Sequence, residues 1–206
     1  MIKIVNLSKK FKKNVIFDNF NLEIKAGEMV AVTGESGCGK TTLLHIIGLL
    51  EEKTGGELII NNVKNPKSNT KSGRKLLKND IGFIFQNFAL VDNYSVIENF
   101  TVTDSERGNN VKEYLSALDR VGLGELNMHR KVCTLSGGEQ QRIAIAKLIY
   151  KNPNIILADE PTGSLDIKNR DKVISILKEL KKLGKTILIV THDEFIAKEC
   201  DWEVKL

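Results

Sequence analysis

The chain has 206 residues, 41% of them hydrophobic and 28% charged, which is the composition of a soluble globular domain and not of a disordered chain or a fibre. No run reaches the roughly 18 apolar residues that span a bilayer, and the N-terminus lacks the basic and apolar segments of a signal peptide, so we expect neither a membrane-spanning nor an exported protein. The net charge is 31 − 26 = +5, but the basic residues are mostly Lys, which favours a solvated surface over nucleic-acid binding.

The first 60 residues carry the pattern of short strands. The alternation of apolar side chains predicts strands over Ile2–Leu7, Val15–Asp18, Phe20–Ile24 and Glu57–Ile60, with a hairpin turn at Asn61-Asn62. Met29–Thr33 is a continuous apolar run, which is typical of a strand buried on both faces. We therefore expect antiparallel strands packed against one buried strand.

Short apolar runs alternate with helical patterns in the rest of the chain. The runs are Ile81–Phe85, Ile155–Ala158 and Thr186–Val190. Helices are predicted over Asn110–Val121, with Val111, Leu115, Leu118 and Val121 on one face, and over Ile167–Leu183, with Val173, Leu177 and Leu180 on one face. This alternation predicts a parallel sheet with right-handed crossovers, and residues 87–132, which are rich in helical pattern, predict a helical lobe within a single domain over 1–206.

A glycine-rich segment between the strand Met29–Thr33 and a predicted helix over Thr42–Leu50 matches the phosphate-binding pattern G-x-x-x-x-G-K-[ST]. Its glycines let successive N–H groups turn inward at a helix N-terminus, where they bind anions. Lys40 supplies a positive charge between the terminal phosphates, and Thr41 offers a hydroxyl to Mg²⁺. The predicted nucleotide-binding residues are Gly34, Glu35, Ser36, Gly37, Cys38, Gly39, Lys40, Thr41 and Thr42.

Two later strands end in polar residues. Ile155–Ala158 runs into Asp159 and Glu160, and Thr186–Val190 runs into Thr191 and His192. In open parallel sheets the ligand lies beyond the carboxyl ends of the strands. We therefore predict that Asp159 binds Mg²⁺ opposite Thr41, that Glu160 orients or activates a water molecule, and that His192 is catalytic. These residues together indicate a nucleotide hydrolase.

A second candidate anion site is Leu135-Ser136-Gly137-Gly138-Glu139-Gln140, directly before a predicted helix over Gln141–Tyr150. Two interpretations stay open. Ser136 could be the N-cap of that helix, followed by two turn glycines. Alternatively, Ser136, Gly137 and Gly138 grip phosphate, which makes sense for a nucleotide bound to another subunit because this chain already has one phosphate loop.

These motifs in this order resemble the ATP-binding subunit of an ATP-binding cassette (ABC) transporter over nearly the whole chain. The phosphate loop matches Gly34–Thr41, the family signature matches Leu135–Gln140, and the γ-phosphate histidine matches His192. The resemblance adds three roles. It implies that Phe11 stacks on adenine, that Gln86 contacts Mg²⁺ and the permease, and that Asp166, at the end of Pro161-Thr-Gly-Ser-Leu-Asp166, contacts the partner subunit.

The resemblance also implies a fold class, partners and a location. The fold is an α/β P-loop NTPase with a mostly parallel core sheet, an N-terminal antiparallel β subdomain and a helical subdomain. Two copies, in a homodimer or pseudo-dimer, would enclose two ATP molecules with Mg²⁺, with Ser136 and Gly138 acting on the other subunit's nucleotide. A separate transmembrane permease would bind near Gln86 and residues 87–95, which places the chain at the cytoplasmic face of the cell membrane.

Within the family, Ala158–Asp166, Phe85–Phe88 and Thr191–Asp193 resemble the group of macrolide, antimicrobial-peptide and bacteriocin exporters and lipoprotein-release systems. Cys38 stands where that group usually has Ser, and its backbone N–H can still serve the phosphates. One alternative is a cassette that transmits ATP-driven motion to envelope enzymes without moving a solute. Another is a soluble nucleic-acid ATPase, which is disfavoured because the chain has no coiled-coil or zinc insertion between its motifs.

Two further features carry weaker predictions. Lys9, Lys10, Lys12 and Lys13 flank Phe11 and could help to hold nucleotide phosphates or be surface residues of a turn. The three cysteines, Cys38, Cys133 and Cys200, form no paired motif, so we expect neither a disulfide framework nor a zinc site, as in a reducing cytoplasm.

Overall fold

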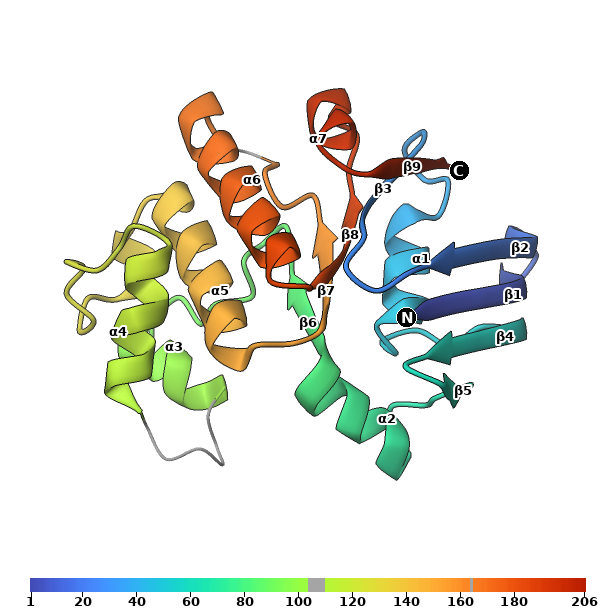
Figure 1. Ribbon diagram of the computed structural model, residues 1–206, viewed down its shortest axis with the longest axis horizontal. Coiled ribbons are helices and arrows are strands. Elements are labelled where there is room, and N and C mark those ends of the chain that lie inside the picture. The colour runs from blue at the N-terminus through green and yellow to red at the C-terminus, as the bar shows by residue number, and fades with distance from the viewer. Residues whose placement is uncertain (104–109, 164) are drawn as a thin grey trace.

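The N-terminal strands form an antiparallel sheet in the computed structural model, which describes residues 1–103, 110–163 and 165–206 (Figure 1). The sheet order is β2-β1-β4-β5, with β1 over Ile2–Phe11, β2 over Asn14–Ile24, β4 over Gly55–Ile60 and β5 over Val63–Lys64. The hairpin predicted at Asn61-Asn62 joins β4 to β5. The two strands predicted over 15–18 and 20–24 are a single strand. Asn19 adopts a left-handed backbone there, and the irregular register with β1 absorbs it as a bulge.

A second, five-stranded sheet forms the centre of the molecule, and every pairing in it is parallel, as predicted. Its order is β6-β7-β8-β3-β9, with β3 over Met29–Thr33, β6 over Ile81–Ile84, β7 over Ile155–Asp159, β8 over Thr186–Val190 and β9 over Trp202–Lys205. The central strands are buried on both faces, which explains their continuous apolar sequences.

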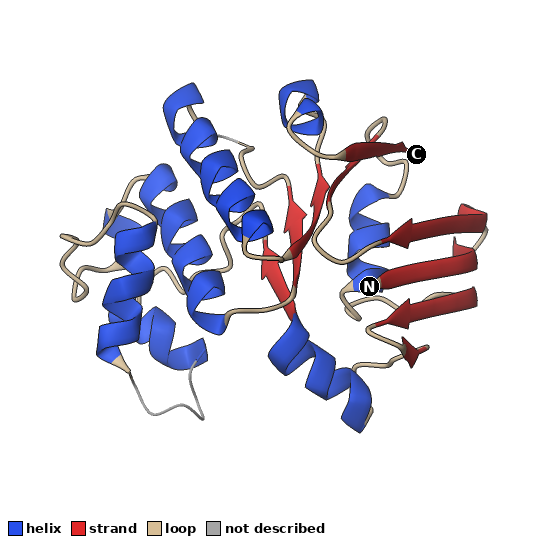
Figure 2. Ribbon diagram, viewed as in Figure 1, coloured by secondary structure: helices blue, strands red, loops and turns tan. Residues whose placement is uncertain are grey.

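Helices cover both faces of the parallel sheet (Figure 2). Helix α1, Lys40–Ile47, packs its apolar residues with Leu157 and Val190 in one hydrophobic cluster. Helices α5, Gly137–Lys151, and α6, Ile167–Lys182, pack theirs with Ile156 and Ala158 in the other. Because neighbouring residues of a strand point to opposite faces, α1 and α5 lie on opposite sides of the sheet.

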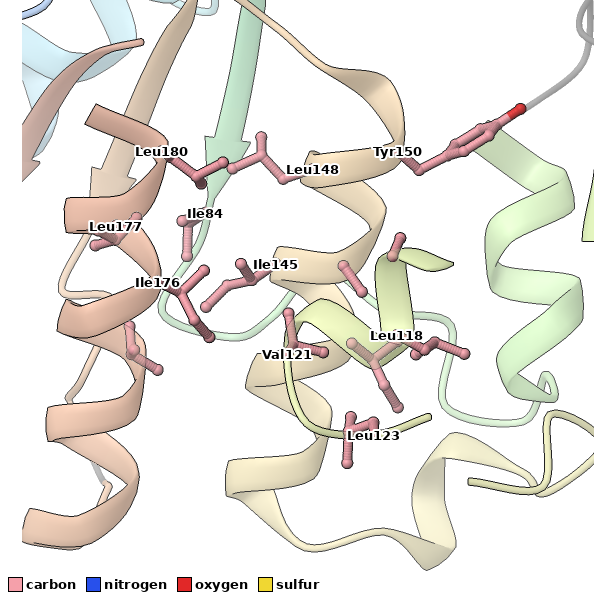
Figure 3. Packing of buried hydrophobic residues seen from close by; sticks show 14 of the residues in the cluster. Ile84, Leu118, Val121, Leu123, Ile145, Leu148, Tyr150, Ile176, Leu177 and Leu180 are labelled. Atoms are coloured by element: carbon pink, nitrogen blue, oxygen red, sulfur yellow. The ribbon is translucent and has the colours of Figure 1, made fainter. Parts of the chain in front are cut away.

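The helical lobe packs against α5. Its helices are α3, Val96–Thr103, and α4, Val111–Arg120, followed by a short 3₁₀ turn, Val132–Thr134. Figure 3 shows residues of α4, α5, α6 and β6 in one continuous apolar cluster. The described residues of α3 and α4 therefore share their core with α5. The remaining elements are α2, Lys71–Lys75, which continues into a π-helical turn, Leu76–Asp80, and α7, Glu194–Lys198.

The apolar face predicted for α4 is partly wrong. Leu118 and Val121 are buried as expected, but Val111 and Leu115 are each 41% exposed. Tyr114 takes their place, with its ring centroid 4.8 Å from that of Phe100 and 4.9 Å from that of Tyr150. A large aromatic side chain buries more surface than Val or Leu, and it sets the rotation of the helix.

In the described part of the chain, no helix is both long enough and apolar enough to cross a lipid bilayer.

Candidate functional site

Four parallel strands end at the same edge of the central sheet. β3 leads into the glycine-rich loop, β6 into Gln86, β7 into Asp159 and Glu160, and β8 into Thr191 and His192. The strands are in register, with Asp159 opposite Val190. Motifs from distant parts of the sequence are thus brought together at this edge.

The glycine-rich loop has the backbone that its sequence predicts. Gly34, Gly37 and Gly39 all have positive φ angles. At Gly39, with φ of 105°, an added Cβ atom would lie 2.5 Å from the Cγ2 atom of Ile16, so the loop packs closely against β2 and only glycine fits. Lys40 follows directly, and its Nζ atom donates hydrogen bonds of 2.8 Å to the carbonyl oxygens of both Gly34 and Glu35.

The middle of the glycine-rich loop is exposed to solvent. Glu35, Ser36 and Gly37 are exposed, while Cys38 is half-buried with its Sγ atom 3.9 Å from the Nζ atom of Lys40. Thr41 and Thr42 lie in the first turn of α1, so their N–H groups belong to the positive end of that helix.

A hydrogen bond joins α1 to the end of β7. The hydroxyl of Thr41 donates to Oδ1 of Asp159 over 3.3 Å. Burial raises the pKa of the Asp159 carboxyl, and the bond from Thr41 opposes that rise. Two oxygen donors therefore lie together beside the phosphate loop, in a place where a nearby cation would favour the ionised carboxylate.

Glu160 is held in an unusual conformation. Its φ angle of 44° lies in the left-handed region, which costs free energy for a residue with a side chain, and its N–H donates to the carbonyl oxygen of Val190 over 2.9 Å. The carboxylate accepts a 3.1 Å hydrogen bond from the hydroxyl of Thr191 and lies 2.7 Å from Nδ1 of His192. The Glu160 side chain is 15% exposed, whereas that of His192 is 76% exposed.

Thr191 was not among the predicted site residues, although it is fully buried and bonds directly to Glu160. The signal that could have found it is a hydroxyl residue placed directly between a buried strand and a polar residue at the site edge. Gln86 is exposed, and it lies near Gly163, where an added Cβ atom would be 3.7 Å from its Nε2 atom.

Ser136 is the N-cap of α5, which is one of the two interpretations that the sequence left open. Its hydroxyl accepts from the N–H of Glu139, and the Glu139 carboxylate in turn accepts from the Ser136 N–H and hydroxyl. The hydrogen bond from the Ser136 hydroxyl lowers the pKa of Glu139. Ser136 and Gly137 are exposed, whereas Gly138 is buried against Asn169, 2.8 Å from where its Cβ atom would be.

The start of α5 lies at the same sheet edge as the phosphate loop but on the other face. The C-terminal end of α5 leads within a few residues into β7, so the two run antiparallel and the N-terminus of α5 is near the carboxyl end of β7. A 2.6 Å hydrogen bond from Nε2 of Gln141 to the carbonyl oxygen of Pro161 agrees with this. The sheet thus lies between Ser136–Gly138 and Lys40–Thr41, and the fold does not bring the two candidate anion sites of one chain together around one phosphate.

The last two predicted residues, Asp166 and Phe11, lie at the start of a helix and at the end of a strand. Asp166 is the N-cap of α6 and accepts from the N–H of Asn169 over 2.9 Å, and this bond lowers the pKa of Asp166. Ser164, which belongs to the same predicted loop, lies outside the described residues. Phe11 ends β1 with its side chain 44% exposed, and the Nζ atom of Lys9 lies 4.2 Å from the centre of its ring.

Comparison with known proteins gives a consistent picture. A family model described as "ABC transporter" matches residues 17–163. The chain is 40% identical over 215 residues to the lipoprotein-releasing system ATP-binding protein LolD of Rickettsia bellii, covering 100% of this chain and 95% of that protein. It is 39% identical over 208 residues to the macrolide export ATP-binding/permease protein MacB of Chlorobaculum tepidum, covering 98% of this chain but only 32% of the longer protein.

Solved structures match as well. The dimeric structure of MJ0796, a bacterial ABC transporter cassette, superposes with a TM-score of 0.89 at 38% identity, covering 100% of this chain and 94% of the cassette. A structure of the same cassette in a post-hydrolysis state, bound to ADP and Pi, matches with the same TM-score of 0.89.

Proposed function

The chain belongs to the ABC transporter family as an ATP-binding cassette that hydrolyses ATP, and on that premise we propose that it is the motor subunit of a membrane exporter. Its relatives include proteins named for lipoprotein release and for macrolide export. The observation that carries the proposal is the group at the sheet edge, in which the Thr41–Asp159 bond lies beside the Glu160 carboxylate held by Thr191 and His192.

In this proposal the nucleotide is held at both ends. The ring of Phe11 stacks on adenine, and the loop from Gly34 to Thr42 surrounds the phosphates with N–H groups. The ammonium of Lys40, now bonded to two loop carbonyl oxygens, would turn to the β- and γ-phosphates.

The donor set beside the loop fits Mg²⁺. The hydroxyl of Thr41, the carboxylate of Asp159 and the amide oxygen of Gln86 are hard oxygen ligands of the kind that Mg²⁺ binds together with phosphates and water. When bound, the ion would neutralise developing charge on the phosphate oxygens. Burial raises the pKa of the half-buried Asp159 carboxyl, and such a cation would favour its ionised form.

Hydrolysis in this proposal depends on Glu160. Its carboxylate orients the attacking water and receives a proton from it. Thr191 fixes one carboxylate oxygen. His192, which is mostly exposed and whose Nδ1 lies against Glu160, would contact the γ-phosphate.

Two copies complete the site in this proposal. Because the sheet separates Ser136–Gly138 from the phosphate loop of the same chain, the start of α5 is available to a nucleotide held by a partner. Asp166, at the start of α6, would contact the partner subunit. A separate permease would bind near Gln86 and residues 87–95, where Val91 and Tyr94 are exposed, and so hold the chain at the cytoplasmic face of the membrane.

The proposal is tested by measuring phosphate release from Mg²⁺-ATP by the purified chain, alone and co-purified with the permease encoded by a neighbouring reading frame. We expect release that EDTA abolishes and that the permease changes. If no permease alters the rate or co-purifies with the chain, the exporter assignment is wrong, while the ATPase assignment is judged separately from the EDTA result.

Replacing Thr191 with Val should lower hydrolysis about tenfold at unchanged ATP affinity, because a hydrogen bond to a charged group is worth about 1.5 kcal/mol or more. The shape of the side chain is kept. The bond to Glu160 is lost, together with the one that the hydroxyl accepts from the N–H of Asp193 over 3.0 Å. Thr186→Val is the matched control. It removes a buried hydroxyl from the other end of β8, where Thr186 accepts from the N–H of Gly27, and it should lower the melting temperature without this effect on turnover. Equal losses of turnover in both variants would contradict the role of Thr191.

Replacing Phe11 with Ala should weaken ATP binding by about 1–3 kcal/mol, the scale of contacts between bases and aromatic side chains. Isothermal titration calorimetry with ATP measures the change. Val15→Ala, which shortens another exposed apolar side chain of the same hairpin, should have no effect. An unchanged dissociation constant for the Phe11 variant would mean that its ring does not stack on adenine.

A further inference from the structure

Lys9 is the buried member of the basic group around Phe11. It is only 6% exposed, whereas Lys10, Lys12 and Lys13 are exposed. Its Nζ atom donates to Oε1 of Glu51 and to the carbonyl oxygen of Glu52, both over 2.7 Å. The expectation that Lys9 is a surface residue of a turn is therefore wrong, since its side chain is buried and its ammonium is hydrogen-bonded within the fold. A buried lysine is rare unless it is paired, and here it is.

The partners of Lys9 belong to the segment that follows α1. This is the helix that begins with Lys40 and Thr41 and ends just before Gly48. The N–H of Glu51 donates back to the carbonyl oxygen of His45 over 3.2 Å, which fixes that segment to the helix. The N–H of Lys10 donates a hydrogen bond to the hydroxyl oxygen of Thr54 over 3.1 Å, and this bond holds the same segment against β1. Lys9 therefore ties the end of β1 to the far end of the phosphate-binding helix.

The same ammonium also sets the ring of Phe11. The Nζ atom lies 4.2 Å from the ring centre, within the range of a cation–π contact, and so covers one face of the ring. The side chain is nevertheless 44% exposed. Lys9 thus covers one face of the Phe11 ring, and the other face is left for a flat ligand.

We propose that Lys9 is a positioning residue for base recognition, which holds the Phe11 ring so that its free face meets adenine at a fixed distance from the phosphate loop. The inference rests on the proposed stacking of Phe11 on adenine. It goes further in assigning to a buried lysine, which itself touches no nucleotide, the alignment of the base site with the phosphate site. The ammonium also holds the pKa of Glu51 below its ordinary value through their hydrogen bond.

The test compares a ligand that has a base with one that lacks it. Isothermal titration calorimetry with ATP and with inorganic tripolyphosphate is run on Lys9→Met, on Lys3→Met as the control at an exposed lysine of the same strand, and on Phe11→Ala with and without Lys9→Met. Lys9→Met should weaken ATP about three- to tenfold, the range of a partly desolvated cation–π contact. It should leave tripolyphosphate binding unchanged. Lys3→Met should change neither, and Lys9→Met should cost nothing more once Phe11 is Ala.

The other outcomes distinguish a failure of positioning by Lys9 from a failure of adenine stacking. If Lys9→Met weakens ATP and tripolyphosphate equally, or adds its full effect to that of Phe11→Ala, Lys9 only supports the fold and the proposal is overturned. If Phe11→Ala weakens ATP but Lys9→Met does not, positioning by Lys9 fails while adenine stacking stands. If Phe11→Ala itself has no effect, it is the stacking that fails. Should Lys9→Met melt below the assay temperature, Lys9→Gln, which keeps a donor for Glu51 but no charge over the ring, serves for the same comparison.

Discussion

Glu160→Gln is expected to bind ATP as tightly as the unaltered chain and to hydrolyse it about 10²–10⁴-fold more slowly, which is the usual contribution of a positioned acid or base. The amide has the shape of the carboxylate and can still accept the hydrogen bond from Thr191, so the site should keep its geometry. It cannot take a proton from water. Phosphate release and the ATP dissociation constant, measured on the same preparation, separate the two effects.

A matched control is available on the edge strand of the same sheet. Glu203 of β9 also accepts a hydrogen bond from a threonine, Thr33, next to the phosphate loop. Glu203→Gln should hydrolyse ATP at close to the normal rate. If Glu160→Gln keeps its turnover, or loses ATP binding together with it, Glu160 is not the residue that handles the water.

Lys40→Ala should reduce ATP affinity about a hundredfold or more, because hydrogen bonds to charged groups are worth about 1.5–3 kcal/mol each and this ammonium is expected to make more than one to the phosphates. The two 2.8 Å bonds that Lys40 now makes to loop carbonyl oxygens show that its side chain reaches across the loop. Equilibrium binding of ATP measures the loss, and circular dichroism verifies that the variant is folded.

Lys53→Ala is the control for this variant. Lys53 also donates to a backbone carbonyl oxygen, that of Gly56, but lies in the segment after α1 and away from the loop. Its removal should leave ATP affinity unchanged. Near-normal affinity of the Lys40 variant would refute the assignment of Gly34–Thr41 as the phosphate site.

The parts of the site that could be predicted from the sequence are those in which a motif and its structural setting are contiguous. A buried strand, a glycine-rich loop and a helix follow one another from Met29 to Ile47, so the residues themselves define the phosphate loop. Asp159 and Glu160 follow directly on another buried strand. The α/β cassette fold predicted from these motifs is confirmed by the likeness to a solved cassette at a TM-score of 0.89.

The parts that could not be predicted depend on contacts between distant segments. The bond from Thr191 to Glu160 joins residues 31 positions apart, and the bond from Lys9 to Glu51 joins residues 42 apart. In the sequence Lys9 is one of four lysines around Phe11, and only the packing of β1 on the segment after α1 shows which of them is buried. The rotation of α4 was missed because periodicity ranks Val and Leu alike, whereas the aromatic packing of Tyr114 decides it.

The placement of α1 and α5 on opposite faces is likewise a property of the sheet. Each helix satisfies its own local pattern, and the choice of face follows from which strand residues each one covers. This placement turns the second anion site, which the sequence left ambiguous, into a site for a partner's nucleotide in our proposal. Ser136 can serve as N-cap and still lie at the exposed start of α5.

The central claim, that two copies share each ATP, is tested most directly by light scattering on the hydrolysis-deficient chain. With Mg²⁺-ATP, Glu160→Gln should have twice the 23.0 kDa mass of the single chain. Adding Ser136→Arg should leave a monomer that binds ATP with unchanged affinity, because the bulky arginine side chain fills the space in front of α5 that the partner's phosphates need. A Ser136→Arg variant that still dimerises, or whose monomer loses ATP affinity, would show that Ser136 does not act on the nucleotide of a second subunit.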